Sequence, residues 1–103
     1  MDRPADERCP VEAVAEIISQ KWVALILRDL AGGPRRFGEL QHSVKISPRV
    51  LSARLQELEH RGLVSRAVFA EVPPPRTEYT LTARGRLLVP LIDEMRRIGK
   101  DFI

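Results

Sequence analysis

Segment 48–61 carries side chains whose types and spacing suit contacts with DNA bases. A helix of 3.6 residues per turn places three leucines of this segment on one stripe and polar side chains on the opposite face. The stripe consists of Leu51, Leu55 and Leu58, and the outward face of Arg49, Ser52, Ala53, Gln56 and His60. Arginine can donate to guanine, glutamine can pair with adenine, and small residues let the helix approach the base edges. We therefore expect Arg49, Ser52 and Gln56 to contact bases in a major groove, the alternative being an ordinary solvated helix.

Basic residues are concentrated in the middle of the chain. Residues 1–34 hold four basic and six acidic side chains, residues 35–86 hold ten and five, and residues 87–103 hold three of each. A cationic centre between acidic and neutral ends is typical of a nucleic-acid-binding surface, with random surface charge as the alternative. We expect phosphate contacts from Arg35, Arg36, Lys45 and Ser47. We also expect Arg76, in the hairpin predicted after segment 48–61, to contact DNA.

The elements before segment 48–61 predict a helix-turn-helix. Residues 37–44 have helical periodicity, and a short turn joins them to Ser47. The Ser47 hydroxyl can accept a hydrogen bond from an unpaired N–H of the next turn, and Pro48 suits the first helical position. Two helices joined by a tight turn are typical of DNA-binding proteins.

The residues after this segment predict a β-hairpin. Apolar and polar residues alternate over residues 63–69 and again over 77–81. The prolines between these runs cannot donate to a central ladder, so they form a stiff tip that carries Arg76. A hairpin over about residues 63–82 makes the arrangement a winged helix, whose tip can place an arginine in the minor groove.

Further helices are expected at both ends of the chain. Pro10 begins an apolar periodic segment that ends at Ser19, and a second stripe runs to Leu30 before a Gly-Gly-Pro stop. Thr82 caps the last helix, which Pro90 should bend by removing one backbone hydrogen bond. The fold class is therefore mainly α with a small β-hairpin wing.

Length and composition limit the chain to one domain. With 103 residues, of which 44% are hydrophobic and 30% charged, we expect a single domain over 1–103, with 1–8 as a flexible N-terminal tail. No apolar run approaches the ~20 residues of a membrane span, and no signal peptide opens the chain. A cytoplasmic protein without a membrane partner is expected.

No arrangement for catalysis or metal binding is visible. One cysteine excludes an internal disulfide, and Cys9, His42 and His60 lack the spacing of metal ligands. A nucleophile–base pair and a phosphate-binding loop are also missing. We therefore expect no enzyme activity, no metal and no cofactor.

Several motifs resemble the HxlR-type winged-helix transcriptional regulators, in the same order over about residues 9–99. They are Cys9-Pro10-Val11-Glu12, Lys21-Trp22 with Leu25-Ile26-Leu27-Arg28, Gly33-Pro34-Arg35-Arg36-Phe37-Gly38-Glu39-Leu40, the leucine-rich run from Ser47 to Glu59, Gly62-Leu63-Val64, Glu71-Val72-Pro73-Pro74, and Glu78-Tyr79-x-Leu81-Thr82-x-x-Gly85. The resemblance implies a homodimer that binds double-stranded operator DNA, with segment 48–61 in the major groove and the wing on the flank. It also implies dimerisation through the N- and C-terminal helices. Ile98 departs from the family, which often has an aromatic residue there.

The resemblance also implies thiol-based sensing, because some members detect oxidants or electrophiles through a cysteine near position 9. A thiol at a helix N-terminus has its thiolate favoured by the helix dipole, and Arg8 adjoins Cys9. The alternative is a cysteine without a redox role, so the identity of any small-molecule or oxidant effector stays open. For the whole chain, the alternative is a winged-helix protein-interaction module that does not bind DNA.

Overall fold

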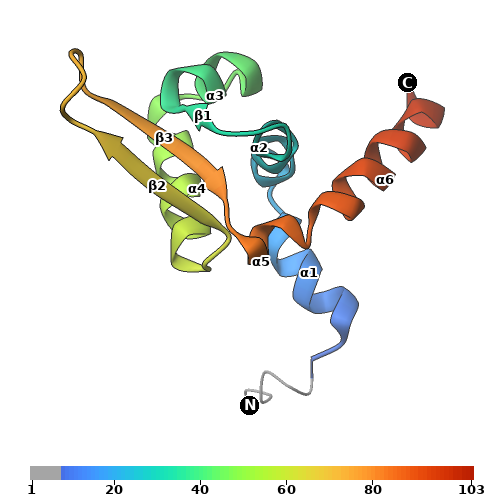
Figure 1. Cartoon of the computed structure of the whole chain (residues 1–103). Helices are drawn as coiled ribbons and strands as arrows, with labels where there is room; N and C mark the ends of the chain where they lie inside the picture. Colours follow the sequence, from blue (N-terminus) through green and yellow to red (C-terminus); the bar gives the residue numbers. More distant parts are fainter. Residues whose placement is uncertain (1–7) are drawn as a thin grey trace.

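The structure is a computed structural model and describes residues 8–103. Its elements, labelled in Figure 1, are α1 (Pro10–Ile18), α2 (Lys21–Ala31), β1 (Arg35–Arg36), α3 (Phe37–Val44), α4 (Pro48–His60), β2 (Val64–Phe69), β3 (Arg76–Leu81), α5 (Ala83–Arg86), α6 (Val89–Gly99) and η2 (Lys100–Phe102). The helices expected at 37–44 and 48–61 are confirmed to within one residue. The tail expected over 1–8 lies outside the described residues except for Arg8, which forms an ion pair with Glu16 of α1.

The turn between α3 and α4 sets the direction of α4. Lys45 follows α3 with φ at 61°, in the left-handed region, and this conformation ends α3 and begins the turn. Ile46 is buried beneath the turn. The Ser47 Oγ accepts a hydrogen bond of 3.3 Å from the Val50 amide, and Pro48 occupies the first turn of α4. The predicted N-cap is therefore confirmed.

The wing, which is the hairpin of β2 and β3, joins the short β1 in a three-stranded antiparallel sheet in the order β1-β3-β2. Tyr79 of β3 lies opposite Arg66 of β2 on one side and Arg35 of β1 on the other. The strand β1 was not expected, because two residues are too short to show an alternation. Only Val64 is buried in β2, so the hairpin leaves the body of the molecule soon after it begins. Figure 1 shows its tip projecting far from the helices.

Helix α2 forms the centre of the core. It contacts α1, α3, α4, β3 and α6. The largest fully buried side chains are Ile26, Leu27, Leu30, Leu40, Leu51, Leu55 and Leu58. Full burial of such a side chain stabilises a fold by roughly 1.5–3 kcal/mol. The leucine stripe predicted for α4 is thus confirmed as the surface that fixes this helix on the core. In contrast, α1 has no buried residue and rests on the core through half-buried side chains.

The expectation of one bent helix at the end of the chain was wrong. Thr82 does cap a helix, since its Oγ1 accepts a hydrogen bond of 3.0 Å from the Gly85 amide, but this helix is only the short α5. The chain then turns at Leu87 and Leu88, and Pro90 lies in the first turn of a separate helix, α6. A proline N atom cannot donate to the carbonyl four residues earlier, so a new first turn, where no such donor is needed, is its favoured place.

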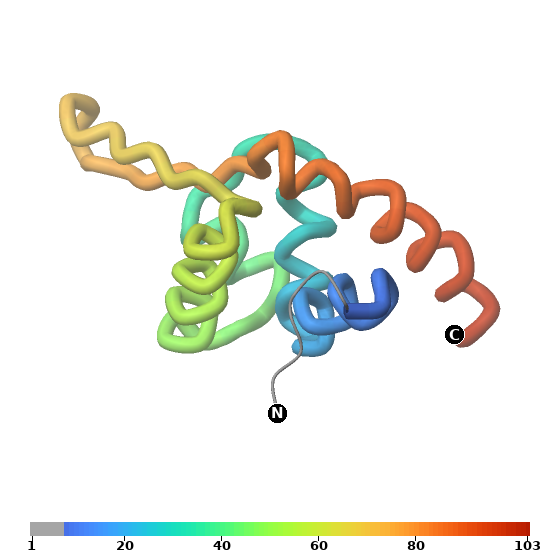
Figure 2. The backbone as a smooth tube through the Cα atoms, turned by 90° about the horizontal axis from the view of Figure 1, so that it is seen from below, coloured from blue at the N-terminus to red at the C-terminus, as the bar shows by residue number. Residues whose placement is uncertain are grey.

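The wing and the C-terminal helix extend from opposite sides of the molecule. Figure 2 shows the hairpin at one end, α6 reaching away at the other, and α1 and α2 between them. None of the helices in residues 8–103 has both the length and the apolar character needed to span a bilayer.

Candidate nucleic-acid interface

The outward face of α4 has the geometry expected of a base-contacting surface. Arg49, Ala53, Gln56 and His60 are exposed, and Ser52 is half-buried at the edge of the face. Burial of the three leucines on the opposite side leaves this face without any large apolar group. The arrangement of the face agrees with the expectation, while contact of Arg49, Ser52 and Gln56 with bases stays a prediction.

Ion pairs neutralise the acidic residues in the second half of α4. Glu57 Oε2 lies 3.0 Å from Arg54 Nη1, and Glu57 Oε1 lies 3.9 Å from Arg61 Nε. Glu59 Oε1 lies 3.5 Å from Arg66 Nε. The pair between Arg54 and Glu57 joins residues three apart on α4. These arginines therefore reduce the repulsion that two carboxylates would exert on a phosphate backbone.

The cationic residues at the start of α4 are available for an outside partner. Among residues 8–103, neither Lys45 nor Arg49 forms an ion pair, and both are exposed. Lys45 borders a shallow polar hollow of about 440 Å³ beside α3. Its other lining residues are Gly38, Gln41, His42 and Ile46. A positive, hollowed surface next to a helix N-terminus is a favourable place for phosphate.

The remaining predicted phosphate contacts differ in how free their side chains are. Arg36 is exposed, and its amide donates a hydrogen bond of 2.8 Å to Glu39 at the start of α3. Arg35 is half-buried, and its Nη1 donates a hydrogen bond of 2.9 Å to the carbonyl of Pro34. Ser47 already uses its hydroxyl oxygen as the N-cap acceptor. Arg36 is therefore the member of this group with the fewest competing contacts.

Arg76 lies in the last pair of the β2–β3 ladder and not in the turn itself. Its Nε lies 3.2 Å from Glu78 Oε2, and its guanidinium lies over the ring of Phe69 at 5.1 Å. Val68 and Val72 near the tip are exposed. The tip thus presents apolar side chains beside an arginine that is already held by the wing.

A second candidate surface lies on the terminal helices, away from the wing. Its exposed apolar side chains are Val11, Leu87, Met95, Ile98 and Phe102. An apolar hollow of about 480 Å³ lies between α1 and the α5–α6 junction, and another of about 200 Å³ lies between α2 and α6. Only Ile92 of α6 is buried. A surface this apolar is typical of a protein interface.

Cys9 is exposed and occupies the N-cap position of α1. The backbone N–H groups of Glu12 and Val11, which face the Cys9 side chain, lower the pKa of its thiol below the ordinary value because they stabilise the thiolate. This is the direction expected for a thiol at a helix N-terminus, while a sensing role for Cys9 stays a prediction. Among residues 8–103, no group of three His, Cys, Asp or Glu side chains could hold a metal ion.

Sequence reasoning missed one polar cluster, which joins α4 to the wing. It consists of Glu59 on α4, Arg66 on β2 and Tyr79 on β3. Glu59 and Arg66 are seven residues apart on different elements, so no helical or strand spacing connects them. Their proximity follows only from the turn that folds β2 back against α4.

A helix-turn-helix followed by a small antiparallel sheet defines a winged-helix protein. Residues 17–103 match the family described as HxlR-like helix-turn-helix. The chain belongs to this family, whose relatives are named as helix-turn-helix-type transcriptional regulators.

Individual relatives cover nearly the whole chain. YvaP of Bacillus subtilis, named as a helix-turn-helix-type transcriptional regulator, is 42% identical over 99 residues, which is 94% of this chain and 91% of YvaP. The oxidised form of the redox regulator HypR is 36% identical with a TM-score of 0.83, and the match covers 90% of this chain and 96% of HypR. Diamide-treated YodB from B. subtilis is 34% identical with a TM-score of 0.73, covering 93% of this chain and 96% of YodB.

Proposed function

We propose that this transcriptional regulator is a homodimer that binds operator DNA. In this proposal α4 enters the major groove, and the wing contacts the flanking backbone. The observation that carries the proposal is the outward face of α4, where exposed Arg49 and Gln56 flank the small side chain of Ala53. Opposite this face, the leucine stripe holds the helix rigidly. Such a protein works in the cytoplasm, where it has access to chromosomal DNA.

The proposal separates residues that select a sequence from those that supply affinity. Arg49, Ser52 and Gln56 contact base edges, and their hydrogen bonds discriminate between sequences. Lys45, Ser47, Arg35 and Arg36 contact phosphates, and Arg76 contacts the backbone or minor groove from the wing. Phosphate contacts act on every sequence and weaken as salt rises.

A pair of variants tests this division. A preferred duplex is first enriched from a random library, and binding to it and to a random duplex is measured at several salt concentrations. Gln56→Ala should cost about 1–3 kcal/mol on the preferred duplex and little on the random one. Arg36→Ala should weaken both and reduce the salt slope by about 0.9. Arg97→Ala on α6, whose guanidinium pairs with Glu94, is the matched control.

Equal effects of Gln56→Ala and Arg36→Ala on both duplexes would overturn the division of roles. Absence of binding by the folded protein at low salt would overturn DNA binding itself. That second result would favour an acidic protein as the partner of the basic face.

The homodimer is proposed to form through the terminal helices. The exposed fraction is 76% at Leu87 and 81% at Phe102, although both side chains are apolar. Covering this surface with a second copy would remove it from water, which is the main favourable term in association. The two α4 helices would then meet two half-sites, as in other helix-turn-helix dimers.

We also propose that Cys9 responds to oxidants or electrophiles. Support comes from its exposure and its lowered thiol pKa, together with similarity to HypR, which is named a redox regulator. Diamide takes two electrons and two protons from two thiols, so Cys9 would form a disulfide with Cys9 of a second copy or with an added small thiol. This treatment should change the affinity for the preferred duplex, and Cys9→Ser should abolish the response. An equal response in Cys9→Ser would overturn the sensing role.

A further inference from the structure

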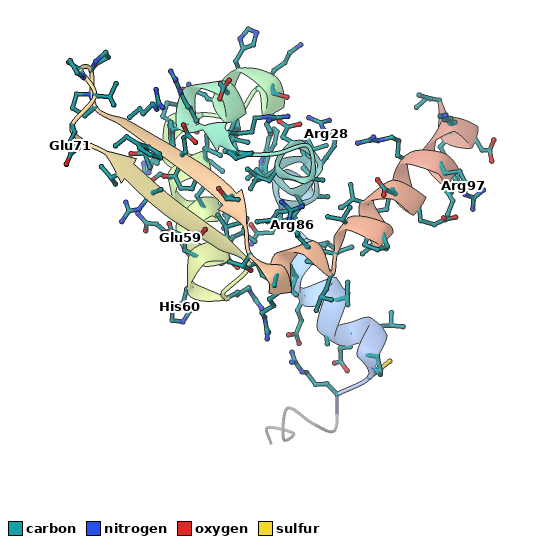
Figure 3. All side chains as sticks on the ribbon, in the orientation of Figure 1. Arg28, Glu59, His60, Glu71, Arg86 and Arg97 are labelled. Atoms are coloured by element: carbon teal, nitrogen blue, oxygen red, sulfur yellow. The ribbon has the colours of Figure 1, made fainter. Side chains whose placement is uncertain are left out.

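The polar cluster between α4 and the wing lies where the wing leaves the body. Val64 is buried, whereas every later residue of β2 is exposed. Arg66, two residues after Val64, lies at the start of the projecting part of β2, and its Nε is 3.5 Å from Glu59 Oε1 in the last turn of α4. Figure 3 labels Glu59 on α4 beside the β2 strand. This ion pair links the recognition helix directly to the wing.

Tyr79 forms the other side of the same cluster. It lies opposite Arg66 in the β2–β3 register and is only 8% exposed. Burial raises the pKa of the Tyr79 phenol, and the charge of Glu59 raises it further, whereas Arg66 lowers it by its charge and a hydrogen bond. The Arg66 guanidinium thus interacts with a carboxylate from α4 and with a phenol anchored in the core.

Among the ion pairs of residues 8–103, the pair between Glu59 and Arg66 is the one that joins β2 to α4. The exposed residues beyond Arg66 face solvent, and the pair between Arg76 and Glu78 lies within the wing itself. Strand β3 is held to the body by its pairing with β1, which reaches Tyr79 and Glu78, whereas β2 is the edge strand on the other side of β3. The ion pair between Arg66 and Glu59 adds a charged link from β2 to α4, two residue pairs beyond Val64 and Leu81, and this link restricts motion of β2 relative to α4.

We propose that Arg66 is a positioning residue, held by Glu59 and Tyr79, that fixes the angle between α4 and the wing so that both contact one DNA duplex. The inference rests on the proposed DNA-binding function. It adds a residue that determines whether α4 and the wing contact the same duplex together. In the competing assignment, Arg66 contacts a phosphate directly and Glu59 only repels DNA.

The substitution Glu59→Gln distinguishes the two assignments, because they predict opposite changes in DNA affinity. It keeps the side-chain shape but removes the charge that holds Arg66. If Arg66 contacted phosphate directly, loss of a nearby negative charge would strengthen binding. If Arg66 positions the wing, binding to a duplex long enough to reach the wing should weaken by about fivefold, the upper value for a single exposed ion pair. Glu57→Gln, on the same helix but paired with Arg54 of α4 and Arg61 at its C-cap and not with the wing, controls for the removed charge.

The experiment is completed by measuring the affinity of each variant for a long and a short form of the preferred duplex. The wild type should bind the long duplex more tightly than one trimmed to the half-sites contacted by α4. Glu59→Gln and Arg66→Ala should lose most of this gain while keeping their affinity for the short duplex. The double variant with Glu59→Arg and Arg66→Glu, which restores an ion pair in reverse, should recover part of the gain. Circular dichroism verifies that each variant is folded.

The possible failures are distinguishable. Wild-type protein that binds neither duplex contradicts the proposed function itself. If the wild type binds the long and the short duplex equally, the wing contributes nothing to affinity. This result overturns the inference about Arg66 but leaves the proposed DNA binding intact. An unchanged or tighter affinity of Glu59→Gln for the long duplex also overturns it, as does failure of the reversed pair to recover any gain.

Discussion

Replacement of Gly85 by alanine tests how α5 is packed against the base of the wing. A Cβ at this buried position would lie 2.1 Å from the carbonyl oxygen of Leu63 and 3.2 Å from Leu81 Cδ2. The same Leu63 oxygen accepts a hydrogen bond of 3.0 Å from the Thr82 amide. A methyl group at residue 85 therefore forces α5 away from the hydrogen bond that anchors its first turn.

The size of the effect follows from these contacts. Ordinary contact begins near 3.4 Å, so Cβ must gain about 1.3 Å of separation from the Leu63 oxygen. Overpacking of this kind costs about 1–3 kcal/mol, and loss of one hydrogen bond costs about 1 kcal/mol. The better helix propensity of alanine returns at most about 1 kcal/mol. Because the overlap is severe, we expect Gly85→Ala to lower the free energy of unfolding by about 2–3 kcal/mol.

Urea unfolding followed by circular dichroism, at one fixed protomer concentration, measures this difference. Gly38→Ala is the matched control, because a Cβ at Gly38 in α3 meets no atom within 4 Å. Its free energy of unfolding should stay unchanged or rise by up to about 1 kcal/mol. Wild-type stability of Gly85→Ala, or equal stability of the two variants, would refute the packing argument.

Three further predictions concern capping, the thiol and the dimer. Ser47→Ala should lower the free energy of unfolding by about 1 kcal/mol through loss of the α4 N-cap, and Ser65→Ala on the exposed face of β2, measured by the same urea unfolding, should not. Because its pKa is lowered, Cys9 should be alkylated by iodoacetamide faster than an ordinary thiol near neutral pH. The rate should fall as the pH decreases through that lowered pKa, and a rate profile matching an unstructured cysteine peptide would contradict this expectation. Leu87→Asp should raise the dimer dissociation constant about a hundredfold in sedimentation experiments, because it buries a charge in the proposed interface. Val68→Asp, at a similarly exposed apolar residue of the wing, should leave the dimer unchanged.

The parts of the fold that follow from local chemistry could be predicted from the sequence. The leucine periodicity of α4, the Ser47 cap and the proline-rich hairpin are each set by a few neighbouring residues. The short strand β1 could not be predicted, because pairing with β3 at Tyr79 and Glu78 creates it. Pro90 indicated a disturbance of the last helix, but the apolar stripe from Leu87 to Ile98 did not show that α5 and α6 are separate helices. The chain breaks at Leu87 and Leu88 because Pro90 has no N–H to donate and is therefore favoured in the first turn of a new helix.

The candidate site shows the same limit for side-chain partners. Outward and inward faces of α4 could be assigned from periodicity, because burial of one stripe fixes the other. Arg76 was expected on the proline-rich tip, but it lies at the end of β3, with its guanidinium over Phe69 of β2 and its Nε near Glu78 of its own strand. The contact with Phe69 depends on the register of the two strands, which alternation alone does not specify.

The two candidate surfaces can be used at the same time because they lie on different sides of α2. The outward face of α4 and the wing occupy one side, and the exposed apolar residues of α1 and α6 occupy the other, as Figure 2 shows for the elements themselves. Helix α2 contacts α1, α4 and α6, so it is the buried connection between both surfaces. Since α1 rests on the core through half-buried side chains only, we expect a modification of Cys9 to shift α1 at a smaller cost than a shift of α2 would carry. In the proposed homodimer, such a shift would change the angle between protomers and so the distance between the two α4 helices, on which binding of two half-sites depends.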